Sequence, residues 1–480
     1  MERWSSRTGF ILAAIGSAVG IGNIWRFSAV VGQNGGGAYL IPYLAAVFLC
    51  ALPLMILELS MGRHFQGNVV SAFRSVRSQF RIIGWLLCGI VFLVLAYYVV
   101  IAGWTLGYAF FSVAGQTVPF SAFTGGWLPI LFFIITTAIT GIVVSRGVSK
   151  GIERLSVILI PFSIGTLVAL AAYGLTLPGF IEGLAFLFTP DFSVLGDPLL
   201  WSAAFGQAFF SLSVGTGILL TYGAYISREQ KIPVASVIIT GADVVVALLA
   251  GIVIFPIVFS FGLVPTIGAE LAFSTLPAAF AVMPGGWLFA AAFFLVLFFA
   301  ALTSSVSMLE VAVAAIRESL NWSRQRAAAI LTGLVLVVGL PSALSYSGAD
   351  LRIGGIRVLD FMDETVGTLG LPIAAVLVAV VFTWFLPRTV LDEEIGPALS
   401  RFIHPLCRVV IPAVLIVTTA ARLLSGLDYP GMRNLPGSEF IGTLLQTEAI
   451  ITIILVIIGL ILLFCRFRTC PLADRLRGLK

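Results

Sequence analysis

The sequence has little charge and few of the side chains that soluble enzymes use. Asp, Glu, Lys and Arg together make up 10% of its 480 residues, whereas a soluble globular domain carries roughly 25%. The presence of only two histidines argues against a histidine-built metal site. The five cysteines are scattered, without the spacing of metal ligands or of a disulfide framework. These shortages exclude a water-soluble enzyme.

Apolar residues fill the chain instead. They make up 59% of it, and the mean hydropathy is +1.10. Because a membrane-crossing helix needs about 20 apolar residues, we predict an all-α polytopic membrane protein with about twelve spans. The predicted spans are 9–31, 38–65, 82–113, 127–145, 153–174, 199–226, 234–262, 287–316, 325–345, 361–387, 404–425 and 446–466. The linkers between them are short, so residues 1–480 are expected to form one transmembrane domain.

The distribution of positive charge predicts the orientation. Most of the 27 Lys and Arg residues lie in the termini or in loops on the same side as the termini, for example Arg63, Lys150 and Arg228. Loops on the other side hold few, such as Arg352 and Arg357. Because short cytoplasmic loops retain positive charge, both termini are expected in the cytoplasm and the protein in the plasma membrane. The first apolar run continues into a full-length span, which predicts no cleavable secretory signal.

Two spans are interrupted by glycines at corresponding places. Span 1 contains GSAVGIGN at 16–23, and span 6 contains SLSVGTG at 211–217. Each glycine weakens a helix by about 1 kcal/mol, and backbone groups freed inside a membrane must be buried in protein or line a wet cavity. Close helix packing through small residues is the alternative explanation, but it does not account for the polar Asn23, Ser211 and Ser213. Paired breaks of this kind indicate an inverted-repeat transporter with its site near the midplane.

At these residues the chain resembles the neurotransmitter:sodium symporter family. The matching stretches are WSSRTGF (4–10), GSAVGIGNIWRF (16–27), NGGGAY (34–39), IPY (41–43), SKGIER (149–154), GQAFFSLS (206–213) and LTSS (302–305). The resemblance implies the leucine-transporter (LeuT) type of fold, a 5+5 inverted repeat with broken helices 1 and 6. The first repeat would cover 9–174, the second 199–387, and 404–466 would add two spans. The short loop between spans 3 and 4 is typical of prokaryotic members.

The resemblance implies sodium-coupled symport of an amino acid by alternating access, with two co-transported sodium ions and no organic cofactor. The residues that match the first sodium site are Ala18, Asn23 and Ser211, and those that match the second are Gly16, Val19, Ala300, Thr303 and Ser304. All of them offer oxygen, which suits a hard cation. On their own, Thr303 and Ser304 would be interpreted as hydroxyls bonded to their own helix.

The same resemblance places the substrate at the breaks. Its carboxylate would meet the amides of Ile21 and Gly22 and the Tyr98 hydroxyl, since the amino end of a half-helix favours an anion. Its ammonium group would meet the carbonyls of Ala18, Phe210 and Ser211 and the Ser213 hydroxyl. Gly20 stands where amine-carrying relatives have an aspartate, so the substrate should bring its own carboxylate. The expected side-chain pocket, which favours a large apolar or aromatic group, consists of Val94, Phe210, Thr216, Ser304 and Met308.

Acids at bilayer depth are functional by default. Glu58 resembles the structural acid that holds the break of span 6 open. Asp243 is expected near or in the first sodium site, where its charge would make transport independent of chloride. A protonated or water-paired Asp243 away from the ions is the alternative. Glu310 is expected to be a buried, partnered acid.

Two gates follow from the resemblance. Arg26 and Asp363 resemble the outer pair, with a snorkelling arginine as the alternative for Arg26. Trp4, Tyr225 and Glu318 match the inner positions. The inner gate's arginine normally stands three residues before Trp4, where this sequence has its first methionine, and Arg3 is a candidate substitute.

Other functions stay open from the sequence. A transporter-like sensor would bind an amino acid without moving it, and a proton could replace sodium as the coupled ion. A membrane enzyme is disfavoured, because the membrane acids are dispersed and form no visible catalytic pair. The expected partners are an amino acid and the lipid bilayer, with no nucleic acid. A homodimer through the late spans is compatible with the sequence.

Overall fold

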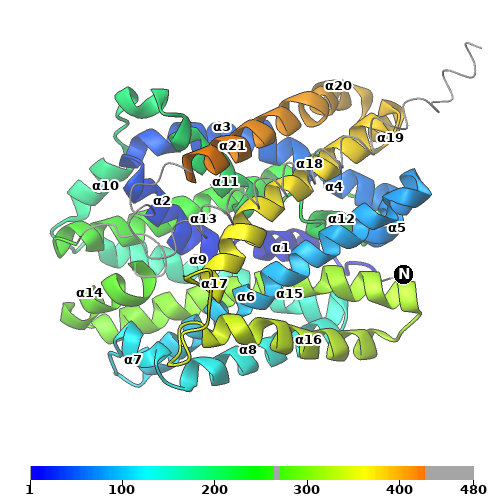
Figure 1. The fold of residues 1–480 in the computed structure, drawn as a ribbon. Coiled ribbons are helices and arrows are strands. Elements are labelled where there is room, and N and C mark those ends of the chain that lie inside the picture. Colours follow the sequence, from blue (N-terminus) through cyan, green and yellow to red (C-terminus); the bar gives the residue numbers. More distant parts are fainter. Residues whose placement is uncertain (1, 264–270, 427–480) are drawn as a thin grey trace, which may run out of the picture.

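A computed structural model describes residues 2–263 and 271–426, which form a bundle of long helices (Figure 1). Span 1 comprises α1 (Arg7–Ala18), the π-helix η1 (Gly22–Arg26) and α2 (Phe27–Gln33). Span 2 comprises η2 (Gly36–Tyr39), α3 (Leu40–Ala46), η3 (Val47–Ala51) and α4 (Leu52–Phe65). Spans 3 to 5 are η4 (Ser78–Phe80) with α6 (Arg81–Val113), α8 (Leu128–Ser145), and η5 (Val148–Glu153) with α9 (Arg154–Gly174).

The second half repeats this plan with its own broken span. Span 6 comprises α11 (Pro198–Ser211) and α12 (Ile218–Ala224), followed by α13 (Ile232–Ser260), α15 (Gly286–Leu320) and α16 (Arg324–Leu344) as spans 7 to 9. Span 10 comprises α17 (Val358–Met362), η8 (Asp363–Gly370) and α18 (Leu371–Trp384), and span 11 comprises α20 (Pro397–Pro405), η9 (Leu406–Val410) and α21 (Ile411–Gly426). The predicted span 12, at 446–466, lies outside the described residues.

Shorter elements connect the spans. The helices are α5 (Val69–Val76), α7 (Phe120–Thr124), α10 (Phe180–Phe188), η6 (Phe192–Gly196), η7 (Leu271–Thr275), α14 (Leu276–Val282) and α19 (Arg388–Ile395). The strands β1 (Arg352–Ile353) and β2 (Ile356–Arg357) form a small antiparallel hairpin. Within the described residues, nine helices are long and apolar enough to cross a membrane, and one bent pair adds a tenth. The predicted all-α polytopic fold is confirmed.

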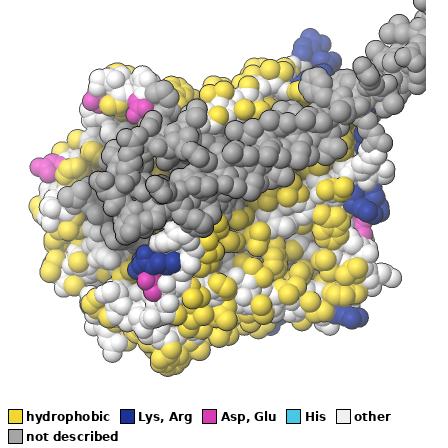
Figure 2. Space-filling model, in the orientation of Figure 1, with side chains coloured by type: hydrophobic (Ala, Val, Ile, Leu, Met, Phe, Trp, Pro, Cys, Tyr) yellow, Lys and Arg dark blue, Asp and Glu magenta, His cyan; other side chains and the backbone are white. Residues whose placement is uncertain are grey.

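The bundle has a buried centre and an apolar exterior. Helices α6 and α15 lie side by side at the centre, and α15 is buried along most of its length (Figure 1). Helices α8, α9 and α16 leave one face exposed, and that face carries side chains such as Ile142, Ile158 and Val337. Figure 2 shows apolar side chains covering the described part of one face, with charged groups mostly toward its edges. This is the surface expected of a protein in a bilayer.

Backbone geometry explains both breaks. Helices α1 and η1–α2 meet at a bend of 55° around Gly20. Between α11 and α12, Ser213, Gly215 and Gly217 have φ angles of 53°, 81° and 79°, a left-handed conformation that glycine adopts without strain. A side chain at Gly215 would also overlap Ala375 of α18. The chain therefore leaves the helix where the glycines stand.

Candidate functional site

The two breaks enclose a small cavity of about 40 Å³ in the middle of the bundle. It is lined by Ser17, Ala18, Gly20, Gly22, Asn23, Val91, Val94, Tyr98, Phe210, Ser211, Ser213, Thr216, Ile218, Ser304, Met308 and Leu371. All predicted substrate residues except Ile21 are in this set. The sequence interpretation missed Ser17, Val91, Ile218 and Leu371. Val91 lies about one helical turn before Val94, which is a usable signal, whereas nothing in the sequence singles out Leu371.

One end of the cavity presents backbone groups from the break of span 1 and the Tyr98 hydroxyl from α6. The amide of Ile21 donates a hydrogen bond to the Tyr98 hydroxyl at 3.2 Å, and the amide of Gly20 donates to Asn23 Oδ1 at 3.0 Å. A Cβ atom at Gly20 would lie 2.9 Å from Ser304 Oγ and 3.0 Å from the Tyr98 hydroxyl. An acidic side chain at position 20 would therefore require these groups to shift. Glycine therefore leaves the space between Ser304 and Tyr98 open.

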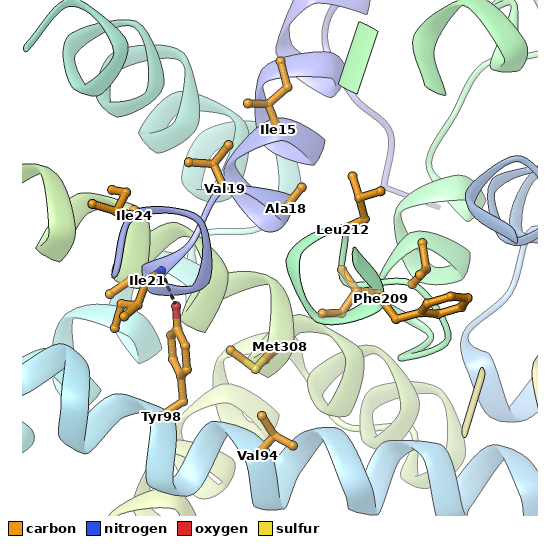
Figure 3. Close-up of a cluster of buried hydrophobic side chains, with 14 of the residues drawn as sticks. Ile15, Ala18, Val19, Ile21, Ile24, Val94, Tyr98, Phe209, Leu212 and Met308 are labelled. Carbon is orange, nitrogen blue, oxygen red and sulfur yellow. Dashed lines mark hydrogen bonds between the residues drawn. The ribbon is translucent and has the colours of Figure 1, made fainter. Parts of the chain in front are cut away.

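The rest of the lining is mainly apolar, and several hydroxyl-bearing residues of the cavity turn their hydroxyls toward the backbone. The Thr216 hydroxyl donates to the Ser213 carbonyl at 2.7 Å, the Ser304 hydroxyl to the Ala300 carbonyl at 3.1 Å, and the Ser213 hydroxyl to the Ser17 carbonyl at 3.0 Å. These hydroxyls are thus engaged by the backbone. Figure 3 shows Val94 and Met308 pointing into the space between the two breaks, with Tyr98 reaching Ile21. A guest side chain there meets mainly hydrocarbon and the Met308 thioether.

A buried polar cluster adjoins the cavity. Asn23 Nδ2 donates to Ser211 Oγ at 2.7 Å and to Asp243 Oδ1 at 2.6 Å, and the Ser211 hydroxyl donates to Asp243 at 2.8 and 3.0 Å. None of the three side chains is more than 2% exposed. The structure therefore brings together, beside Ala18, the residues expected at the first sodium site. Their oxygen atoms are the ligands that a hard cation prefers.

The residues expected at the second sodium site also converge, on the other side of α1. Ser304 Oγ lies 3.4 Å from the carbonyl oxygen of Gly16 and 3.5 Å from that of Val19. The Thr303 hydroxyl donates to the Ala300 carbonyl at 3.0 Å. Both hydroxyls are bonded to their own helix, as the alternative interpretation expects, and that of Ser304 also faces the carbonyls at the end of α1. Residues expected at the second sodium site thus lie together between α1 and α15.

Glu58 supports the break of span 6. Its carboxylate accepts a hydrogen bond from the amide of Gly215, inside the unwound segment. Glu58 is fully buried. Because backbone groups that leave a helix need new partners inside a membrane, this acid satisfies part of the unwound segment.

A larger cavity of about 870 Å³ continues from the site toward the end of the molecule that carries α7 and α14. It shares Gly22, Tyr98 and Phe210 with the small cavity. Arg26 and Asp363 both line it. The Arg26 guanidinium lies 4.6 Å from the centre of the Phe210 ring, and Asp363 accepts a hydrogen bond from the Tyr97 hydroxyl at 2.9 Å. No ion pair joins Arg26 to Asp363 in the described part of the chain.

The opposite end is packed around Trp4. The Trp4 indole donates to the Tyr222 carbonyl at 3.1 Å, and the Tyr225 hydroxyl donates to Glu310 at 2.8 Å. Glu310, as expected, is a buried and partnered acid, since Arg324 binds it at 2.6 Å. Glu318 accepts a hydrogen bond from Asn68 at 2.5 Å. Arg3 is exposed.

Two broken helices that face each other across a cavity, with two oxygen-rich clusters beside the breaks, define a secondary transporter of the LeuT type. The model of the sodium:neurotransmitter symporter family matches residues 1–129 and 122–464. The chain therefore belongs to this family of multi-pass membrane transporters. The family and fold predicted from the sequence motifs are confirmed.

Individual relatives agree. The sodium-dependent transporter YhdH of Bacillus subtilis is 36% identical over 438 residues, which cover 86% of this chain and 96% of YhdH. The structure of MhsT in complex with L-phenylalanine matches with a TM-score of 0.81 and 39% identity, covering 87% of this chain and 99% of MhsT. The neutral amino acid transporter B(0)AT2 of Bos taurus is 29% identical over 293 residues, which cover 53% of this chain and 40% of B(0)AT2.

Proposed function

We propose that this protein is a sodium-coupled symporter of a zwitterionic amino acid with a large apolar or aromatic side chain. The observation that carries the proposal is the cavity between the breaks. It has an amide and a hydroxyl at one end, carbonyl oxygen atoms beside it, and a mainly apolar lining elsewhere. Two similar proteins add support, one solved with L-phenylalanine and one named as a neutral amino acid transporter.

Each part of the substrate has a counterpart in the cavity. The carboxylate would take the place of the contact between Tyr98 and Ile21, while the ammonium group would face the carbonyls of Ala18, Phe210 and Ser211. The side chain would extend toward Val94 and Met308. The free space of about 40 Å³ holds only a few water molecules. Binding therefore requires flexible side chains such as Met308 to move.

Two sodium ions would accompany the substrate. The first would bind Asn23, Ser211 and Asp243 together with the Ala18 carbonyl, and the second would lie between α1 and α15. Two sodium ions and a zwitterionic substrate carry a net charge of +2, of which an ionised Asp243 would neutralise one unit without an anion from solution. This supports transport without chloride.

The transport cycle would alternate between the two ends. We assign the cavity beside Arg26 and Asp363 to the outside and the Trp4 end to the cytoplasm of a prokaryotic cell, because positive charge is retained inside. The continuous cavity on the outer side and the packed Trp4 cluster on the inner side correspond to an outward-facing state.

The test is uptake of each of the twenty amino acids into proteoliposomes under an inward sodium gradient. We expect uptake of leucine- or tryptophan-sized apolar amino acids that disappears when choline replaces sodium. Accumulation that follows a proton gradient without sodium would favour proton coupling. Binding without accumulation would favour a sensor. Preference for glycine or alanine would contradict the expected side-chain class.

A further inference from the structure

Glu2 lies between two arginines at the end of the molecule where the N-terminus lies (Figure 1). Its Oε1 atom is 2.8 Å from Nη1 of Arg317, at the end of α15, and 2.8 Å from Nε of Arg324, at the start of α16. Its Oε2 atom accepts a hydrogen bond from the amide of Val148 at 3.0 Å. One acid on the N-terminal segment thus joins three separate elements: α15, α16 and η5.

The neighbouring residues extend this attachment. The Ser5 amide and hydroxyl bind the Glu153 carboxylate at 2.8 and 2.7 Å, and Trp4 binds α12 through the Tyr222 carbonyl. Residues 2–6 therefore run from α12, the inner half of a broken helix, across to α15 and α16. These elements have to separate if the site is to open toward this end.

We propose that Glu2 acts as a latch: its ion pairs with Arg317 and Arg324 hold the cytoplasmic end of the protein closed. The acid of this latch is on the N-terminal segment, and the two bases are on α15 and α16. This polarity is opposite to the one that the family resemblance implies, an N-terminal arginine facing Glu318. The proposal rests on the proposed function, because a latch has meaning only in a protein that opens.

The exposures of the partners explain how such a latch can open. The side chain of Arg324 is 9% exposed and keeps Glu310, which is 0% exposed, as a partner when Glu2 leaves. Glu2 and Arg317 are 27% and 42% exposed and regain water easily. No buried charge is stranded on opening, which would otherwise be costly.

Glu2 carries a negative charge at neutral pH. Burial by itself would raise the pKa of Glu2, but the guanidinium of Arg324, the amide of Val148 and the guanidinium of Arg317 outweigh it and hold that pKa below its usual value. The carboxylate is therefore ionised above about pH 4.5, which includes the whole physiological range.

The test compares Glu2→Gln with Asp350→Asn, using the full-length protein in proteoliposomes. Glutamine keeps the size of Glu2 and loses its charge. Asp350 is a matched control, because it also lies between two arginines, Arg352 at 2.9 Å and Arg357 at 3.3 Å, but in the loop between the far end of α16 and the hairpin. Amide hydrogen exchange of residues 2–9 and the apparent sodium affinity are measured for each variant, together with the melting temperature.

We expect Glu2→Gln to speed exchange in residues 2–9 and to weaken the apparent sodium affinity by about threefold to tenfold, because the outward-facing population falls. The melting temperature should stay unchanged, and Asp350→Asn should behave like the parent protein. The proposal would be overturned if Glu2→Gln had the amide exchange and the sodium affinity of the parent protein. It would also be overturned if the two quantities changed only together with a lower melting temperature, or if they changed equally in Asp350→Asn. Uptake by the parent protein in the same vesicles tests the proposed function separately, and the exchange measurement does not depend on it.

Discussion

Hydroxyl groups in the site illustrate how little a residue's type says about the surface it presents. Thr216 and Ser304 line the cavity, but both hydroxyls donate to backbone carbonyls. A polar side chain of the substrate would find no free donor on them. The apolar selectivity that we propose thus depends on rotamers, which neighbouring carbonyls decide.

Asp243 gives the prediction at the residue scale. Replacing Asp243 by asparagine removes the negative charge beside Asn23 and Ser211 while keeping the size of the side chain. Because an unbalanced charge in a buried site is costly, we expect the apparent sodium affinity to fall by about tenfold or more, equivalent to at least about 1.4 kcal/mol. Sodium titration of uptake measures it.

Chloride provides the companion measurement. The parent protein should transport equally well when gluconate replaces chloride, and the Asp243→Asn variant should gain from added chloride. A parent protein that loses uptake in gluconate, or a variant with the parent's sodium affinity, would show that Asp243 does not serve as the balancing charge.

At the scale of elements, the break between α11 and α12 depends on Gly215. Its φ of 81° is strained for any residue with a Cβ atom, and such an atom would overlap Ala375. We expect Gly215→Ala to destabilise the protein by about 1–3 kcal/mol and to abolish sodium-dependent substrate binding. Thermal unfolding and a binding assay measure the two effects.

Gly333 of α16 is the matched control for that variant. A Cβ atom there would meet nothing within 4 Å, so Gly333→Ala should leave binding intact and stabilise the helix by about 0.5–1 kcal/mol. If Gly215→Ala bound substrate as well as Gly333→Ala, the unwound segment would not need its left-handed turn.

At the scale of the whole molecule, the large cavity and the packed Trp4 end describe one state of a cycle. Val30 lines that cavity, and Val113 is 69% exposed at the end of α6, outside it. Sodium and substrate together should close the cavity by bringing Arg26 to Asp363. When sodium and substrate are both present, we expect a cysteine at Val30 to react at least about fivefold more slowly with a membrane-impermeant thiol reagent. A decrease of this size means that most molecules have closed the cavity.

The controls for this reaction are built into the chain. A cysteine at Val113 should keep its rate, and Asp363→Asn should remove the slowing at Val30. The native Cys50, Cys88 and Cys407 are buried, and the parent protein supplies the background rate. A cysteine at Val30 that reacts equally fast with and without ligands would contradict closure of this cavity.

The sequence by itself determined the membrane class, the described spans, both breaks and the family. These properties are local, because the length of an apolar run and the placement of glycines act within one segment of chain. Asn23 and Ser211, which match the family motifs, also met in space as expected, since the motifs fix their positions on the two broken spans. Asp243 stands in no such motif, and its hydrogen bonds to both residues come from the packing of α13 against the breaks.

Tertiary structure alone decided the rest. Leu371 lines the cavity because α18 packs against the break at Gly215. Glu2 pairs with Arg317 and Arg324 because residues 2–6 cross the ends of α15 and α16. Glu318 was expected among the inner residues, and its partner Asn68 comes only from the structure. Partners of this kind are remote in sequence, and local patterns carry no signal for them. Only the packing of the helices brings their charges and hydroxyls within reach of one another.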